Sequence, residues 1–117
     1  MLSYYNVPVV STAGALENPL RTLRAVARAD DFVVIKLDCD QPAIEWALIQ
    51  QILHEPGLAA RIDELYWEHH VLKHPMAYTL GGWGVAKARR TMNETIEESF
   101  RTFARLRELG IRAHSWV

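Results

Sequence analysis

The sequence contains very little cysteine and no long hydrophobic run. Cys39 is the only cysteine, which excludes an internal disulfide and a cysteine-based zinc site and favours a reducing compartment, either the cytoplasm or the interior of an organelle. No segment approaches the roughly 20 consecutive apolar residues of a membrane-spanning helix. The N-terminal residues also lack the basic start and apolar core of a signal peptide. These absences predict a soluble protein without a membrane span.

The chain also lacks an excess of either charge and any linker that would divide it. Its 13 basic and 14 acidic side chains give a net charge of −1. Because nucleic acids and anionic membranes are bound through basic patches, neither partner is expected. No repeat or tract rich in glycine, proline or serine interrupts the 117 residues, half of which are hydrophobic. We therefore expect one domain spanning residues 1–117.

Three short apolar runs have the composition of β-strands, and they cover residues 32–38, 64–70 and 111–117. An earlier run, residues 5–11, contains Pro8, which cannot donate a hydrogen bond to a neighbouring strand. It is expected as an edge strand or an extended lead-in. Helical patterns separate these runs, and such alternation indicates parallel strands joined by right-handed crossovers. The predicted fold class is α/β, a partial Rossmann-like, mostly parallel sheet of about three to four strands flanked by helices.

Proline and capping residues mark the expected helix starts. Asn18 before Pro19 favours one helix start, and Pro42 begins a second helix. The spacing of Thr91 and Glu94 is typical of a capping box before a third helix. That third helix is expected to present an apolar face made of Ile96, Phe100, Phe103 and Leu106.

The helix that begins at Pro42 has an unusually wide apolar face. Its two apolar rows are Ile44, Leu48 and Ile52, and Trp46, Ile49 and Leu53. A surface helix usually carries a single apolar stripe. Two rows therefore predict contact with other parts of a larger domain or with a partner protein.

Acidic and histidine side chains follow the predicted strands at the point where each strand ends. Asp38 ends the run at 32–38, and Asp40 follows two residues later. Glu68, His69 and His70 end the run at 64–70. Ligands of open α/β sheets gather at the carboxyl ends of parallel strands, so these side chains are expected to lie close together. Carboxylate with imidazole suits general-base removal of a proton from a substrate hydroxyl. It also suits a divalent metal, held by Asp38, Asp40 and His69.

A purely structural interpretation of the same residues remains open. Acids at strand ends are often solvated, and Asp40, two residues before Pro42, is placed to cap the next helix. Lys36 shares a strand face with Asp38, which predicts an ion pair rather than a catalytic amine. Cys39 stands between two acids, and neighbouring negative charge disfavours its thiolate.

Three segments carry a family resemblance: VPVVS, DFVVIKLDCD and ELYWEHH. They are similar to the C-terminal half of FkbM-type S-adenosylmethionine-dependent methyltransferases, which typically have a lead-in strand, a strand reading like DFIKIDVEGAE, and a strand ending in E-x-H. Lys36, Asp38 and Asp40 match the K-x-D-x-E positions, and Glu68 and His70 match the strand end. The resemblance implies methyl transfer to an oxygen, S-adenosylmethionine as cofactor, and Asp38, Asp40, Glu68 and His70 as the catalytic residues.

The chain departs from the family pattern in two places. Gln41-Pro42-Ala43-Ile44-Glu45 replaces the G-A-E that follows the acid. The glycine-rich strand that would hold the cofactor would lie upstream of Met1. We therefore expect an incomplete, truncated methyltransferase-like domain that does not catalyse alone and needs a missing N-terminal half or a protein partner. The alternative is a non-catalytic structural or binding subunit that docks in a larger assembly through its apolar helix face and open sheet edge.

Overall fold

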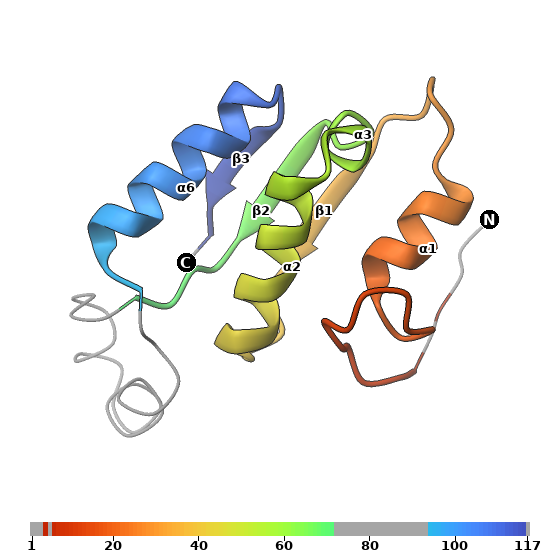
Figure 1. Cartoon of the computed structure of the whole chain (residues 1–117), viewed down its shortest axis with the longest axis horizontal. Helices are drawn as coiled ribbons and strands as arrows, with labels where there is room; N and C mark the ends of the chain where they lie inside the picture. The colour runs from red at the N-terminus through yellow and green to blue at the C-terminus, as the bar shows by residue number, and fades with distance from the viewer. Residues whose placement is uncertain (1–3, 5, 72–93, 117) are drawn as a thin grey trace.

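The computed structural model describes residues 4, 6–71 and 94–116. Helices and strands alternate along this part of the chain, as Figure 1 shows. The elements are α1 (Pro19–Val26), β1 (Val34–Leu37), α2 (Pro42–His54), α3 (Pro56–Ala59), β2 (Glu64–Trp67), α6 (Ile96–Glu108) and β3 (Arg112–Ser115). The strands form one sheet in the order β1-β2-β3, and both pairings are parallel. The predicted α/β class with a small, open parallel sheet is confirmed.

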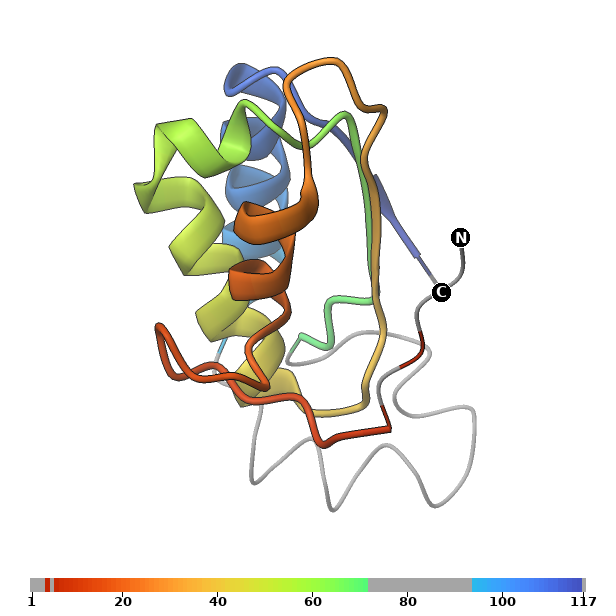
Figure 2. The same ribbon diagram turned by 90° about the vertical axis from the view of Figure 1, so that its right-hand side faces the viewer.

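All the labelled helices lie on the same side of the sheet. Figure 2 views the molecule along the plane of the sheet and shows the helices in one layer and the strands in a second layer beside it. Parallel sheets are usually covered by helices on both faces. Within the described residues this sheet is covered on one face only, which makes the arrangement two-layered.

Strand alternation explains which side chains form the core. Leu37, Leu65, Trp67 and Ala113 are buried, and they pack with the helices in one hydrophobic core. Their neighbours along the strands lie on the other face, because successive side chains of a strand point to opposite sides. There Lys36 pairs with Tyr66, and Tyr66 pairs with His114, across the sheet register.

Both apolar rows of α2 are used inside the chain. Leu48, Ile49, Ile52 and Leu53 are buried, and Ile44 and Trp46 pack against the same core. The two rows reflect contact with other parts of the domain, which was one of the two expected causes. The helix face proposed as a docking surface is therefore not available, because this chain already covers it.

Several predicted boundaries are confirmed and others are wrong. Asn18 is the N-cap of α1, and its side chain accepts a hydrogen bond from the Leu20 amide. Residues 6–11 form no strand, because Pro8 removes a donor from a segment already too short to pair well. The alternative of an edge strand is therefore wrong for these residues, and Tyr5 lies outside the described residues.

The start and the buried face of α6 also differ from expectation. Its N-cap is Thr95, which forms a capping box with Glu98, and Thr91 lies outside the described residues. Phe103 and Leu106 are buried, but Ile96 and Phe100 are exposed to solvent. The helical period correctly predicted the buried residues in the second half of α6, but it wrongly predicted that Ile96 and Phe100, in the first half, are buried.

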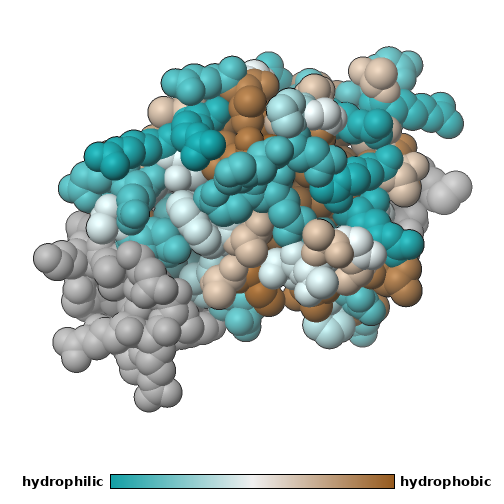
Figure 3. All heavy atoms as spheres, in the orientation of Figure 1, coloured by the Kyte–Doolittle hydropathy of each residue, from teal (hydrophilic) through white to brown (hydrophobic). Residues whose placement is uncertain are grey.

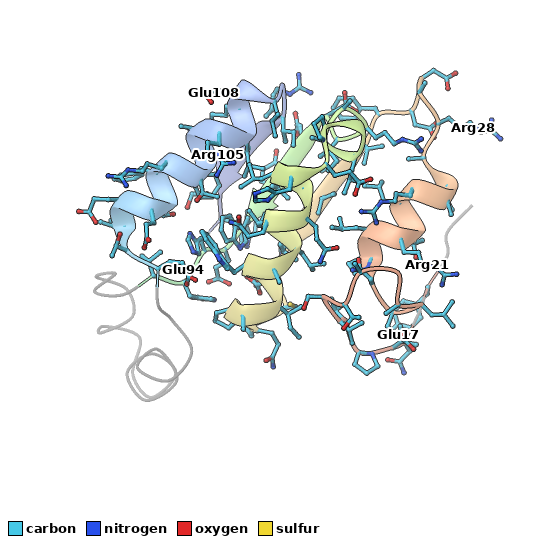
Figure 4. The ribbon with its side chains drawn as sticks, viewed as in Figure 1. Glu17, Arg21, Arg28, Glu94, Arg105 and Glu108 are labelled. Atoms are coloured by element: carbon cyan, nitrogen blue, oxygen red, sulfur yellow. The ribbon has the colours of Figure 1, made fainter. Side chains whose placement is uncertain are left out.

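The helix side of the molecule is mainly hydrophilic. Figure 3 shows that side, with apolar side chains reaching the surface only in small areas between hydrophilic ones. The charged residues labelled in Figure 4 lie around α1 and along α6, and they include Glu17, Arg21, Arg28, Arg105 and Glu108. Among the described residues, no helix is long and apolar enough to cross a membrane.

Candidate functional site at the carboxyl ends of β1 and β2

The four predicted catalytic residues come together where β1 and β2 end. We call Asp38, Asp40, Glu68 and His70 the strand-end cluster. His70 Nε2 lies 3.8 Å from Asp40 Oδ1 and 3.6 Å from Glu68 Oε2. Asp38 and Glu68 share a hydrogen bond. The cluster forms because β1 and β2 are adjacent and parallel, so their carboxyl ends lie at the same edge of the sheet.

Asp38 and Glu68 differ in charge state. Lys36 Nζ lies 2.9 Å from Asp38 Oδ2, which confirms the predicted ion pair. The hydrogen bond from Lys36, followed by the one from Glu68, lowers the pKa of Asp38. Burial, followed by the hydrogen bond and negative charge of Asp38, raises the pKa of Glu68 to about 7. Glu68 is therefore the carboxyl group that carries the proton of the hydrogen bond to Asp38, and it loses this proton as the pH rises through about 7.

His69 lies on the opposite side of the sheet from this cluster. Its ring stacks on Trp67 with centroids 3.9 Å apart, and on Trp46 at 5.4 Å. Its Nδ1 is hydrogen-bonded to Ser99 Oγ at 2.9 Å. Burial, and then the charge of His70, lowers the pKa of His69 to about 4. His69 is thus a neutral histidine packed between the sheet and the helix layer.

The structure groups different metal-ligating atoms from those in the predicted set of Asp38, Asp40 and His69. In the described ranges, the one group of histidine, cysteine and acidic side chains with closely spaced ligand atoms is Asp40, Glu68 and His70. Their ligand atoms all lie within 4.8 Å of one another. Asp40 belongs to both sets. Asp38 forms an ion pair with Lys36 and a hydrogen bond with Glu68, and His69 forms a hydrogen bond with Ser99.

The turn between β1 and α2 is held by Glu45, which has 1% of its surface exposed. Its Oε1 accepts hydrogen bonds from the backbone amides of Cys39 at 2.9 Å and Gln41 at 3.4 Å. Its Oε2 accepts one from Trp67 Nε1 at 3.2 Å. One carboxylate therefore joins α2, the turn and β2.

Asp40 lies in this turn with a φ of 56°, in the left-handed region. Aspartate tolerates this conformation better than most residues do. Asp40 was a candidate helix cap, but the N-cap of α2 is Gln41, whose side chain makes no capping hydrogen bond. The Asp40 side chain instead lies near His70.

The surroundings of Cys39 disfavour its reactive thiolate form. Burial, followed by the negative charge of Glu45, raises the pKa of its thiol to about 11. The expectation that its thiolate is disfavoured is confirmed, although burial is a larger cause than neighbouring charge.

Glu45 and Ser99 are the positioning residues that the sequence did not identify. Glu45 was visible only as a doubtful match to the family pattern, and Ser99 lies 30 positions from His69. Strand alternation is the signal that separates His69 from His70, because neighbouring residues of a strand point to opposite faces.

The described residues do not fit an S-adenosylmethionine site. The turn after β1 contains no glycine. The glycines of the described ranges are Gly14, Gly57 and Gly110. These precede α1, lie in α3 and follow α6, so none forms a glycine-rich turn after a strand, which is what brings a nucleotide close to the backbone.

Comparison with known proteins finds no match to a family model, to a curated protein or to a solved structure. The described residues define a small α/β unit with an open, parallel, three-stranded sheet and a carboxylate-imidazole cluster at one sheet edge.

Proposed function

We propose that this chain supplies the acid-base side of an FkbM-type, methyltransferase-like site that acts on a substrate hydroxyl. The observation that carries this proposal is the convergence of Asp38, Asp40, Glu68 and His70 from two separate strands at the carboxyl edge of the sheet. That edge is where α/β proteins bind and transform their ligands.

Within this proposal, the strand-end cluster accepts the proton of the hydroxyl. A general base works best when its pKa lies near the operating pH, and the pKa of Glu68 is raised to about 7. Asp38 stays ionised beside Lys36, and it accepts a hydrogen bond from Glu68 in the protonated form that Glu68 reaches once it has taken the hydroxyl proton. The methyl donor would be held by residues outside the described ranges or by another polypeptide.

The test is release of S-adenosylhomocysteine by the full chain, isolated with a tag from its native source together with any bound protein. We expect release from hydroxyl substrates to fall by about 100-fold or more in the Glu68→Gln variant, since general-base catalysis contributes about that much. Glu64→Gln is the matched control, because Glu64 begins β2, four positions before Glu68, but pairs with Arg112.

Two results would contradict the proposal. One is an absence of S-adenosylhomocysteine release together with no heat on calorimetric titration of the isolated protein with S-adenosylmethionine. The other is methyl transfer that is equally fast in the Glu68→Gln and Glu64→Gln variants.

A second candidate function is favoured by the sheet face on which no helix of the described ranges lies. We call this surface the open face, and its residues are Phe32, Val34, Lys36, Glu64, Tyr66, Arg112, His114 and Trp116. Phe32 is 63% exposed, and Trp116 is 41% exposed. Tyr66 stacks on His114, and Lys36 lies over the Trp116 ring. Because parallel sheets are normally covered on both faces, this surface suits a binding subunit.

The size and charge of the open face favour a single helix of a partner protein as its occupant. The three strands have four residues each, and together with the flanking Phe32 and Trp116 the open face covers roughly 15 by 20 Å. This area is less than half of the ~800 Å² per partner in a standard interface between two proteins. An amphipathic helix of about 13 residues has matching dimensions. Arg112 is paired with Glu64, and Lys36 with Asp38, so an apolar helix stripe would meet no excess charge.

This candidate is tested with a photo-crosslinking amino acid at position 32, compared with the same amino acid at Arg21 on the outer side of α1. We expect a covalent adduct at position 32 alone, and we expect mass spectrometry to place the partner's crosslink within one amphipathic helical segment. No adduct, adducts of similar yield at both positions, or an adduct with a second copy of this chain would overturn it.

A further inference from the structure

We propose that Asp40, Glu68 and His70 bind a divalent transition-metal cation of the Mn²⁺ or Zn²⁺ type. This inference deepens the proposed function and rests on it for its role: the cation would polarise the same hydroxyl and lower its pKa, and Glu68 would then act as a ligand instead of as the general base. Its geometry, however, is independent of methyl transfer. Each residue offers one ligand atom, and the three atoms lie within 4.8 Å of one another.

The spacing of the three atoms fits a single small cation. His70 Nε2 lies 3.6 Å from the Glu68 carboxylate and 3.8 Å from the Asp40 carboxylate. Ligands about 2.0–2.2 Å from a common ion are separated by roughly 3.0–3.6 Å in octahedral or tetrahedral geometry. The Asp40 and Glu68 ligand atoms lie within 4.8 Å of each other, so a movement of up to about 1 Å, which rotation of these two side chains can supply, would bring all three atoms into coordination.

Burial of the ligands fits a site with open coordination positions. The side chains of His70 and Glu68 are 12% and 28% exposed, whereas that of Asp40 is 55% exposed. Two ligands are thus held on the protein side, and the third is on the solvent side. Three protein ligands with free positions are typical of catalytic metal sites, where water or substrate completes the coordination.

The donor set selects the class of cation. One imidazole nitrogen with two carboxylates is softer than the all-oxygen sites that Mg²⁺ and Ca²⁺ prefer, and it suits Mn²⁺ and Zn²⁺. Asp38 is held beside Glu68 by its ion pair with Lys36, and a bound cation would displace the Glu68 proton and offset the repulsion between the two carboxylates.

The test is calorimetric titration of the full chain with Mn²⁺ after removal of metals with a chelator. Mn²⁺ is preferred over Zn²⁺ as the first probe because it binds thiols weakly, so Cys39 does not interfere. We expect one saturable site. Affinity should fall at least about tenfold in each of the variants Asp40→Asn, Glu68→Gln and His70→Asn. Asparagine at position 40 keeps the left-handed turn accessible, so this variant should stay folded. The Glu64→Gln control should bind within about twofold of the unchanged protein.

Electron spin-echo spectroscopy of bound Mn²⁺ gives a second measurement that does not depend on stability. We expect coupling to one imidazole nitrogen, retained in His69→Asn and lost in His70→Asn. The proposal is overturned if neither Mn²⁺ nor Zn²⁺ binds saturably, or if Glu64→Gln weakens binding as much as Glu68→Gln does. It is also overturned if the nitrogen coupling depends on His69, which would favour Asp38, Asp40 and His69 as the ligands. Metal binding without any methyl transfer would support this inference while contradicting the proposed function.

Discussion

Replacing Glu45 by alanine is expected to lower the free energy of unfolding by about 3 kcal/mol, because it leaves one buried and two partly buried donors without their acceptor. The Glu45 carboxylate accepts hydrogen bonds from the amides of Cys39 and Gln41 and from the Trp67 indole. An unsatisfied buried donor costs about 1–3 kcal/mol. Urea denaturation followed by tryptophan fluorescence measures the loss.

Two further variants make this prediction specific. Glu45→Gln keeps the shape of the side chain but has only one accepting oxygen, so we expect a smaller loss, about 1–2 kcal/mol. Glu97→Ala removes an exposed acid from the first turn of α6 and should cost less than about 0.5 kcal/mol. Equal losses for Glu45→Ala and Glu97→Ala would show that the carboxylate does not hold the turn. Because Asp40 lies in that turn, Glu45→Ala should also weaken Mn²⁺ binding.

The His69→Asn and Glu68→Gln variants are expected to give opposite dependences of stability on pH. The pKa of His69 is lowered from 6.5 to about 4 in the folded chain. Its contribution to stability is therefore complete above about pH 6.5 and is lost as the pH falls towards 4. The pKa of Glu68 is raised from 4.5 to about 7. Its contribution is complete below about pH 4.5 and is lost as the pH rises through 7.

The two effects nearly cancel in the unchanged protein. One pKa unit corresponds to about 1.4 kcal/mol, so each group alone changes stability by about 2 kcal/mol between pH ~5 and pH ~7.5. Without His69, the chain should be more stable at the lower pH, and without the Glu68 carboxyl it should be more stable at the higher pH. The measurement is urea denaturation at both pH values in the presence of a chelator, so that no cation reaches Glu68. Parallel pH profiles for the two variants would contradict the assigned charge states.

Much of the local structure followed from short-range sequence signals. Asn18 before Pro19 predicted the start of α1, and a side-chain cap at Asn18 forms there. The patterned runs predicted all three strands, although each strand is shorter than its run. The ion pair of Lys36 with Asp38 followed from strand alternation alone.

Predictions that depended on long-range packing were less accurate. The wide apolar face of α2 suggested a partner, but it is buried by other elements of the same chain. Phe100 fitted the helical period of α6 and is nevertheless exposed. A periodic pattern shows which residues share a helix face. It does not show whether another element is close enough to cover each turn of that face.

The sequence by itself determined that acids and histidines end two neighbouring strands, because composition and spacing decide where a strand stops. Only the tertiary structure decided which of these residues join the strand-end cluster and which pack against the helices. Contacts with Trp46 and Ser99 hold His69 in the helix layer, whereas His70 remains with Asp40 and Glu68. The division depends on side chains that lie about 30 positions apart in the sequence and meet only when α6 packs on the sheet.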